Sequence, residues 1–201
     1  MLLNFLKTNM SRIMRVLANQ VGVMIFALIM SMTASSMAED LQDSMRLVAS
    51  IFSICFYLFL VFVAMKEEGS RDSVPIEAGR RSFDPLHGLK IGFCATVPNY
   101  LFVLLMLIGL LIGVEYDAAA NALTGSGVGV YSIGYFISAM IQSMYLGVYS
   151  SICAALSVVG EPWVQLLTFS ITPLFAPLAA WLGYFYGVKH PSADRRQNKR
   201  Y

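Results

Sequence analysis

Five long stretches without a charged residue limit what this sequence can fold into. They cover residues 16–38, 47–65, 91–114, 118–160 and 162–188. An apolar run of about 18 residues or more is long enough to cross a bilayer as a helix. Only 13% of the residues are charged, whereas soluble domains average about 25%. We therefore expect one all-α polytopic membrane domain at 18–188, because a water-soluble chain of this length could not bury so many wholly apolar helices.

Residues 1–17 precede the first crossing and are predicted to form an amphipathic helix at the membrane interface. Lys7, Arg12 and Arg15 fall on one side of this helix, and leucine, isoleucine and methionine fall on the other. The same bases can also be read as the positive flank of the first span. Ser36-Met37-Ala38 resembles a small-x-small signal-peptidase site, but the long charged flank favours an uncleaved anchor.

The only long polar segment between the two ends of the chain follows the second span, 41–65. We predict a cytoplasmic loop at 66–90, with Gly69 just past the end of the second helix, where glycine is common. Asp84-Pro85 predicts the start of the third helix, because an N-cap acid followed by proline favours that position.

This loop mixes five bases with five acids, so it can fold through its own ion pairs. We expect Asp72 to pair with Arg80 or Arg81 and to give the loop a defined docking shape. The alternative is a solvated loop whose bases only set the orientation of the helices. The bases also lie where an anionic inner leaflet would attract them. The candidate docking residues are Arg71, Asp72, Arg80, Arg81 and Lys90.

The segment 130–159 decides how often the chain crosses the bilayer. As one helix it would be about 45 Å long, which is too long for one untilted crossing and too short for two. If it dips in and returns as a re-entrant segment, thirteen of the fourteen bases lie in the cytoplasm, including the basic tail at 189–201. If it is a fifth full crossing, the tail lies outside. We favour four transmembrane helices plus a re-entrant segment, with both termini cytoplasmic.

Two amide side chains, Asn99 and Gln142, are the candidate polar residues at membrane depth. They can line a solute path, or they can join helices through hydrogen bonds, which is the commoner role. Pro98 predicts a kink in the third helix. Small residues at Gly109 and Gly113, and at 179, 183 and 187, predict close helix packing, with homodimerisation as the alternative.

Short motifs in the central loop, the third helix and the last helix form a recognisable set. They are Gly69-Ser70-Arg71-Asp72, Gly79-Arg80, His87-Gly88-Leu89-Lys90-Ile91-Gly92, Val97-Pro98 and Gly183-Tyr184-Phe185-Tyr186-Gly187-Val188-Lys189. This set resembles a family of small polytopic bacterial membrane proteins with no assigned activity. The chain departs from that pattern at His87, Val97 and Val188. The resemblance implies a membrane-hugging outer segment before the last helix, which agrees with a re-entrant 130–159.

The sequence carries no signature of a catalytic, metal or cofactor site. HExxH, GxSxG and CxxC are absent, and the two histidines lie singly in the loop and the tail. No basic patch with interleaved aromatics suggests nucleic-acid binding. We expect a multi-pass protein of the cell membrane, without cofactors, that acts as a non-enzymatic scaffold or accessory component through its cytoplasmic loop. Its partners would be the bilayer with its anionic lipids, an unknown membrane protein or a second copy. A small solute transporter or channel built on the kinked third and last helices is the alternative, and an intramembrane enzyme ranks third.

Overall fold

The computed structural model is almost entirely helical and describes residues 2–36, 39–117, 120, 122–156, 158 and 161–191. The long helices are α1 (Leu2–Ser35), α2 (Glu39–Glu77) and α3 (His87–Gly113). A short antiparallel hairpin of β1 (Glu115–Asp117) and β2 (Ala122–Thr124) follows them. The shorter elements then come in the order α4 (Val128–Ile141), η1 (Ser143–Tyr145), α5 (Leu146–Leu156), α6 (Pro162–Ile171), η2 (Thr172–Leu174) and α7 (Phe175–Lys189).

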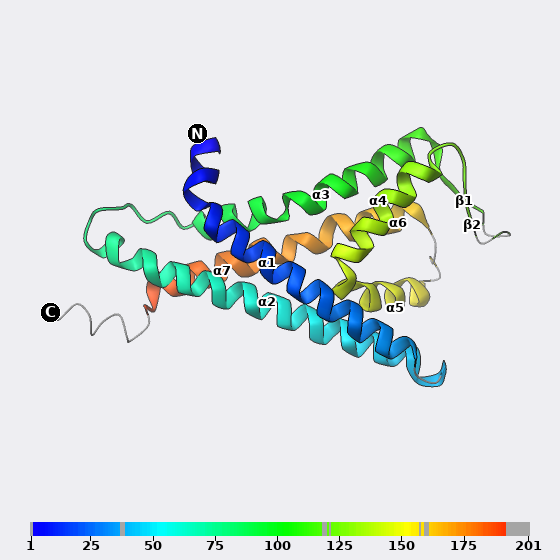
Figure 1. The fold of residues 1–201 in the computed structure, drawn as a ribbon, viewed down its shortest axis with the longest axis horizontal. Helices are drawn as coiled ribbons and strands as arrows, with labels where there is room; N and C mark the ends of the chain where they lie inside the picture. The colour runs from blue at the N-terminus through cyan, green and yellow to red at the C-terminus, as the bar shows by residue number, and fades with distance from the viewer. Residues whose placement is uncertain are drawn as a thin grey trace. The chain divides into compact units, whose positions relative to one another are not determined.

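The described part of the chain contains four helical stretches long and apolar enough to cross a membrane. They are Phe5–Ser35, Leu41–Glu77, His87–Gly113 and Pro162–Lys189. The expected all-α polytopic membrane fold is therefore confirmed. The pair Val128–Ile141 and Ser143–Leu156 bends by 80° at its break (Figure 1), a geometry shared by broken spans and re-entrant loops.

Packing divides the chain into two compact units, each assembled from distant segments. Unit 1 contains residues 1–19, 57–96 and 174–201, and unit 2 contains 20–56 and 97–173. Their charges have opposite signs. Unit 1 has thirteen bases and six acids, a net charge of +7, whereas unit 2 has one base and six acids, a net charge of −5.

The first helix has no break at residue 17. α1 runs without interruption from Leu2 to Ser35. Met10 and Met14 are more than half exposed, while Arg12 is packed against protein. Arg12 thus contacts other parts of unit 1, and an interfacial position for 1–17 stays a prediction. The buried residues recur at spacings of three and four, as in helices packed side by side: Asn9, Ile13, Val16, Gln20, Val23 and Ala27.

The second helix is longer than expected. α2 passes through Gly69 and Pro75 and ends at Glu77, so the segment between α2 and α3 shrinks to 78–86. The terminating glycine is Gly79, at φ 69°. Its N–H bonds the carbonyl of Ile76, and the N–H of Arg80 bonds that of Pro75. These two bonds form a Schellman motif. Placing the helix end at Gly69 was wrong, because that glycine serves helix packing instead.

The predicted capping role of Asp84 is confirmed, although α3 begins at His87, two residues later than expected. Asp84 Oδ1 accepts a hydrogen bond from the Leu86 N–H at 3.0 Å, as an N-cap does. Lys90 Nζ donates to the other carboxylate oxygen at 2.6 Å, which lowers the pKa of Asp84. Trp181 of α7 donates to the carbonyl of Pro85 and holds this start in place.

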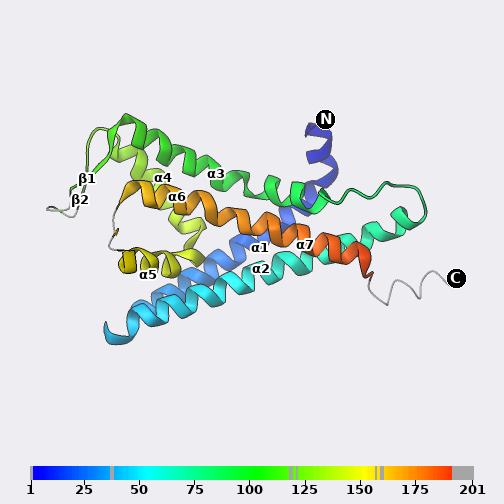
Figure 2. The same cartoon turned by 180° about the vertical axis from the view of Figure 1, so that it is seen from behind.

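The bend between α4 and α5 is fixed by hydroxyl groups of unit 2. Ser143, at the bend, donates to the Met24 carbonyl of α1 at 3.2 Å. Ser50 of α2 donates to the Met144 carbonyl and accepts from the Val148 N–H at 3.2 Å. The two bonds of Ser50 satisfy backbone groups that the break in the helix leaves free. α6 packs against α4 (Figure 2), where Tyr131 donates to Gln165 at 2.7 Å.

Candidate functional site

A buried ionic cluster occupies unit 1, and Asp72 of α2 lies at its centre. Asp72 is only 4% exposed. Arg12 of α1 donates two parallel hydrogen bonds to it, from Nη2 to Oδ1 at 2.7 Å and from Nη1 to Oδ2 at 2.8 Å. Such bidentate pairs are the strongest arginine–carboxylate contacts. The pair joins residues sixty positions apart in the sequence.

Two further groups complete the coordination of Asp72. Arg81, between α2 and α3, places Nη1 3.0 Å from Oδ2. The hydroxyl of Tyr184, on α7, donates to the same oxygen at 3.0 Å. Burying a carboxylate costs several kcal/mol unless it is fully paired. Here α1, α7 and the α2–α3 connection all supply partners.

His87, the first residue of α3, is neutral in this cluster. Its Nε2 atom lies 3.1 Å from Nη1 of Arg12 and 3.3 Å from Nη2 of Arg81. Guanidinium nitrogens only donate, so Nε2 must accept and the ring proton lies on Nδ1. The ring also packs against Phe5 and Tyr184, with centroids 5.7 and 5.1 Å away.

A second buried acid, Glu68, connects the cluster to Arg71. Its carboxylate lies 3.1 Å from Nε of Arg12 and 3.1 Å from Nη1 of Arg71. Glu67, which is partly exposed, pairs with Arg15 at 2.6 Å and with Arg71 at 2.8 Å. The acids therefore lie beneath their arginines, since Asp72 and Glu68 are buried while Arg71 and Arg81 are more than one-third exposed.

Glycines allow the helices of unit 1 to approach closely enough for these contacts. A Cβ at Gly69 would overlap the backbone carbonyl of Tyr184, and one at Gly88 would overlap Tyr184 and Ala180. Gly183 and Gly187 of α7 meet the backbone of α2 in the same way. The predicted close packing within the fold is therefore confirmed for Gly183 and Gly187.

The structure sorts the candidate docking residues into two groups. Arg71, Asp72 and Arg81 belong to the ionic cluster, and the expected pair of Asp72 with Arg81 is confirmed. Arg80 is exposed, and the half-exposed Lys90 pairs with Asp84. The rest of the cluster was missed, namely Arg12, Glu68, His87 and Tyr184. The usable signal for Glu68, His87 and Tyr184 was their place in or beside the short glycine motifs, and Arg12 had no such signal.

The intramembrane amides join helices in unit 2. Asn99 is buried and accepts from Nε2 of Gln20 at 2.9 Å. Gln142 is buried at the break after α4, donates to the Phe169 carbonyl at 3.3 Å and accepts from the Thr172 hydroxyl. Both amides have partners within the protein, so their polar groups close helix contacts. The described residues that line the pocket of unit 2 include neither of them.

The side chains of the cluster form ion pairs and hydrogen bonds with one another, which hold the helices of unit 1 together. Within the described ranges, no three His, Cys, Asp or Glu side chains are placed to hold a metal ion. Comparison with known protein families, with curated proteins and with solved structures finds no match.

Proposed function

We propose that this protein is a non-enzymatic membrane component that presents the segment 66–90 to an acidic partner protein in the cytoplasm. The supporting observation is the buried Asp72, which several segments of unit 1 hold in place. A loop that served only as a charge signal would not require such an anchor. The anchored segment is therefore a shaped surface.

The charge of this surface selects the partner. Asp72 and Glu68 are buried, whereas Arg71, Arg80, Arg81 and Lys90 remain accessible. More of the positive charge than of the negative charge of this segment is therefore exposed to solvent. Complementary charge speeds association and discriminates between partners, so an acidic protein segment fits here better than a basic one.

A photo-crosslinking residue at Ser82 tests this function, because Ser82 is exposed within 78–86. In cells it should give one discrete protein adduct, and the cross-linked peptide should be acidic. Arg80→Glu should reduce that adduct roughly tenfold, since like charges would then face each other. Lys7→Glu, the same charge reversal at another exposed base of unit 1, should leave it unchanged. Lipid adducts alone, or equal yields from both variants, would contradict the proposal.

The proposed orientation places the N-terminus, the segment 66–90 and the C-terminal tail in the cytoplasm, with 130–159 dipping into the membrane from outside. The division of charge supports this topology, since the basic unit contains all three of these regions. Basic residues are retained on the cytoplasmic side of bacterial membranes. The 80° bend between α4 and α5 also suits a segment that returns to its own side.

Cysteine labelling in intact cells distinguishes four crossings from five. In a cysteine-free background, Ser82→Cys and His190→Cys should both resist a membrane-impermeant thiol reagent until the cells are permeabilised. Ala120→Cys, beyond the end of α3, should react at once. All three sites are exposed, so a lack of labelling cannot be caused by burial of the cysteine within the protein. Opposite behaviour of the sites at 82 and 190 would show that α4 and α5 form a complete crossing.

A small solute transporter is the second candidate. The observation in its favour is the bent pair α4–α5 beside a pocket in unit 2, because broken helices commonly build solute sites. Asn99 and Gln142 are hydrogen-bonded within the protein and do not line this pocket, so we rank the transporter second.

A further inference from the structure

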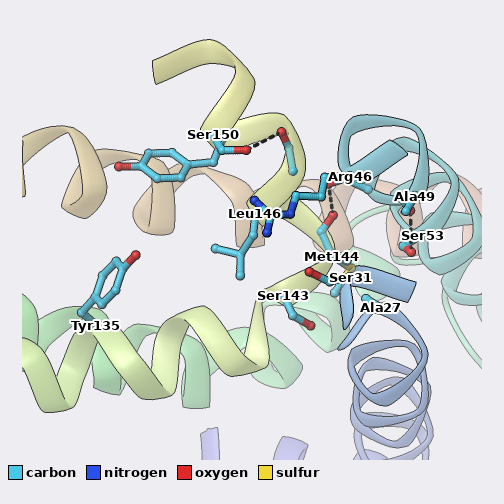
Figure 3. Close-up of a pocket in the computed structure, with 13 residues that line it drawn as sticks. Ala27, Ser31, Arg46, Ala49, Ser53, Tyr135, Ser143, Met144, Leu146 and Ser150 are labelled. Carbon is cyan, nitrogen blue, oxygen red and sulfur yellow. Dashed lines mark hydrogen bonds between the residues drawn. The ribbon is translucent and has the colours of Figure 1, made fainter. Parts of the chain in front are cut away.

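Unit 2 contains a pocket of about 280 Å³ that is separate in its residues from the ionic cluster. α1, α2, α4 and α5 supply its walls, along with the bend between α4 and α5 (Figure 3). α5 lies directly against α2 here, because a Cβ at Gly147 would overlap the backbone of Arg46. Pockets for drug-sized ligands usually exceed about 300 Å³, so this one fits a small group, such as one end of a larger molecule.

Arg46 supplies the only charge among the described residues that line the pocket. Its side chain extends from α2 towards the middle of the pocket in Figure 3. Nη2 of Arg46 donates to the Ser35 hydroxyl at 2.9 Å. That bond uses one of five guanidinium donors. An anion would neutralise the charge and use several of the others.

Two hydroxyl groups are also available to a ligand. Ser31 and Tyr135 line the pocket, and neither hydroxyl has a partner among the described residues. The hydroxyl of Tyr135 points into the space between α4 and α5 in Figure 3. The hydroxyls of Ser50 and Ser143 are already bonded to backbone groups. The free donors of the pocket thus come from three different helices.

The position of Arg46 along its helix suggests where such an anion comes from. Arg46 directly precedes the uncharged run 47–65 of α2. A long basic side chain at the edge of an apolar span extends to the membrane interface, so the guanidinium lies near lipid headgroups. Exposed apolar residues of the same helices, such as Ile29 and Ile51, can contact acyl chains.

We propose that this pocket binds the phosphate of an anionic lipid headgroup, with Arg46 as the principal ligand and Ser31 and Tyr135 as additional donors. The acyl chains remain outside in the bilayer. Arginine suits this role because its planar fork matches phosphate oxygens. The absence of a carboxylate among the described lining residues disfavours a cationic ligand.

Binding to the purified protein in neutral detergent tests the site. The probes are short-chain phosphatidylglycerol, short-chain phosphatidylcholine and inorganic phosphate, with dissociation constants measured by intrinsic fluorescence. Phosphatidylglycerol should bind tightest. Arg46→Gln should weaken it tenfold or more, as expected for about one lost charge-assisted hydrogen bond. Arg80→Gln removes the same charge at an exposed site outside the pocket and should change the affinity less than about twofold.

Tyr135→Phe keeps the test valid if Arg46→Gln unfolds the protein. It removes one hydroxyl that bonds no described residue, so the unfolding temperature should hold while the affinity falls about fivefold. Equal binding of phosphatidylcholine, or equal losses in Arg46→Gln and Arg80→Gln, would overturn the proposal. If inorganic phosphate binds as tightly as phosphatidylglycerol, the ligand is a soluble oxyanion and the proposed lipid headgroup is wrong.

Discussion

Asp72→Asn is expected to destabilise the protein by about 3 kcal/mol or more, because the buried carboxylate that pairs with the partly buried Arg12 and with Arg81 becomes a neutral amide. Thermal unfolding in detergent should show the loss. Trypsin should also cut faster after Arg80 and Arg81, since Arg81 loses the carboxylate that holds it.

The matched control is Glu77→Gln, which removes one negative charge five residues further along α2 at an exposed position. Exposed pairs contribute about 0–1 kcal/mol, so this variant should unfold and be cut almost like the wild type. If the two variants behave alike, the ionic cluster does not hold 78–86, and the docking surface loses its support.

Gly187→Ala should cost about 1–3 kcal/mol, the usual penalty for overpacking a close contact. The added methyl group would overlap the backbone of Lys66, which has no rotamer to move away, so α7 and α2 must separate. The same separation would move Tyr184 of α7 away from Asp72 of α2. Thermal unfolding measures the first effect, and the trypsin assay at Arg80 and Arg81 measures the second.

Gly22→Ala provides the opposite case. Gly22 lies inside α1, and a Cβ there would meet no atom within 4 Å. Alanine favours a helix interior by about 0.5–1 kcal/mol over glycine, so this variant should be as stable as the wild type or more so. Equal destabilisation by both changes would mean that the glycines of α7 do not act through helix contact.

The uncharged runs determined the helices, because a stretch of about 20 apolar residues has few alternatives to crossing a bilayer as a helix. Local chemistry also fixed the start of α3, since an N-cap and its proline act within one turn. The pair of Asp72 with Arg81 could also be predicted from the sequence, because both residues lie in one short polar segment.

Only the tertiary structure decided what the remaining polar groups do. Gly69 looked like a helix end, but the approach of Tyr184 from the far end of the chain uses it as a contact. Arg12 was one of three bases on one side of the first helix, and its acid lies sixty residues away. Gln142 was expected to join helices or to line a solute path, but its partners on α6 and at Thr172 are known only from the fold. Each role depends on a partner distant in sequence, and apolar periodicity does not encode which polar groups meet when helices pack.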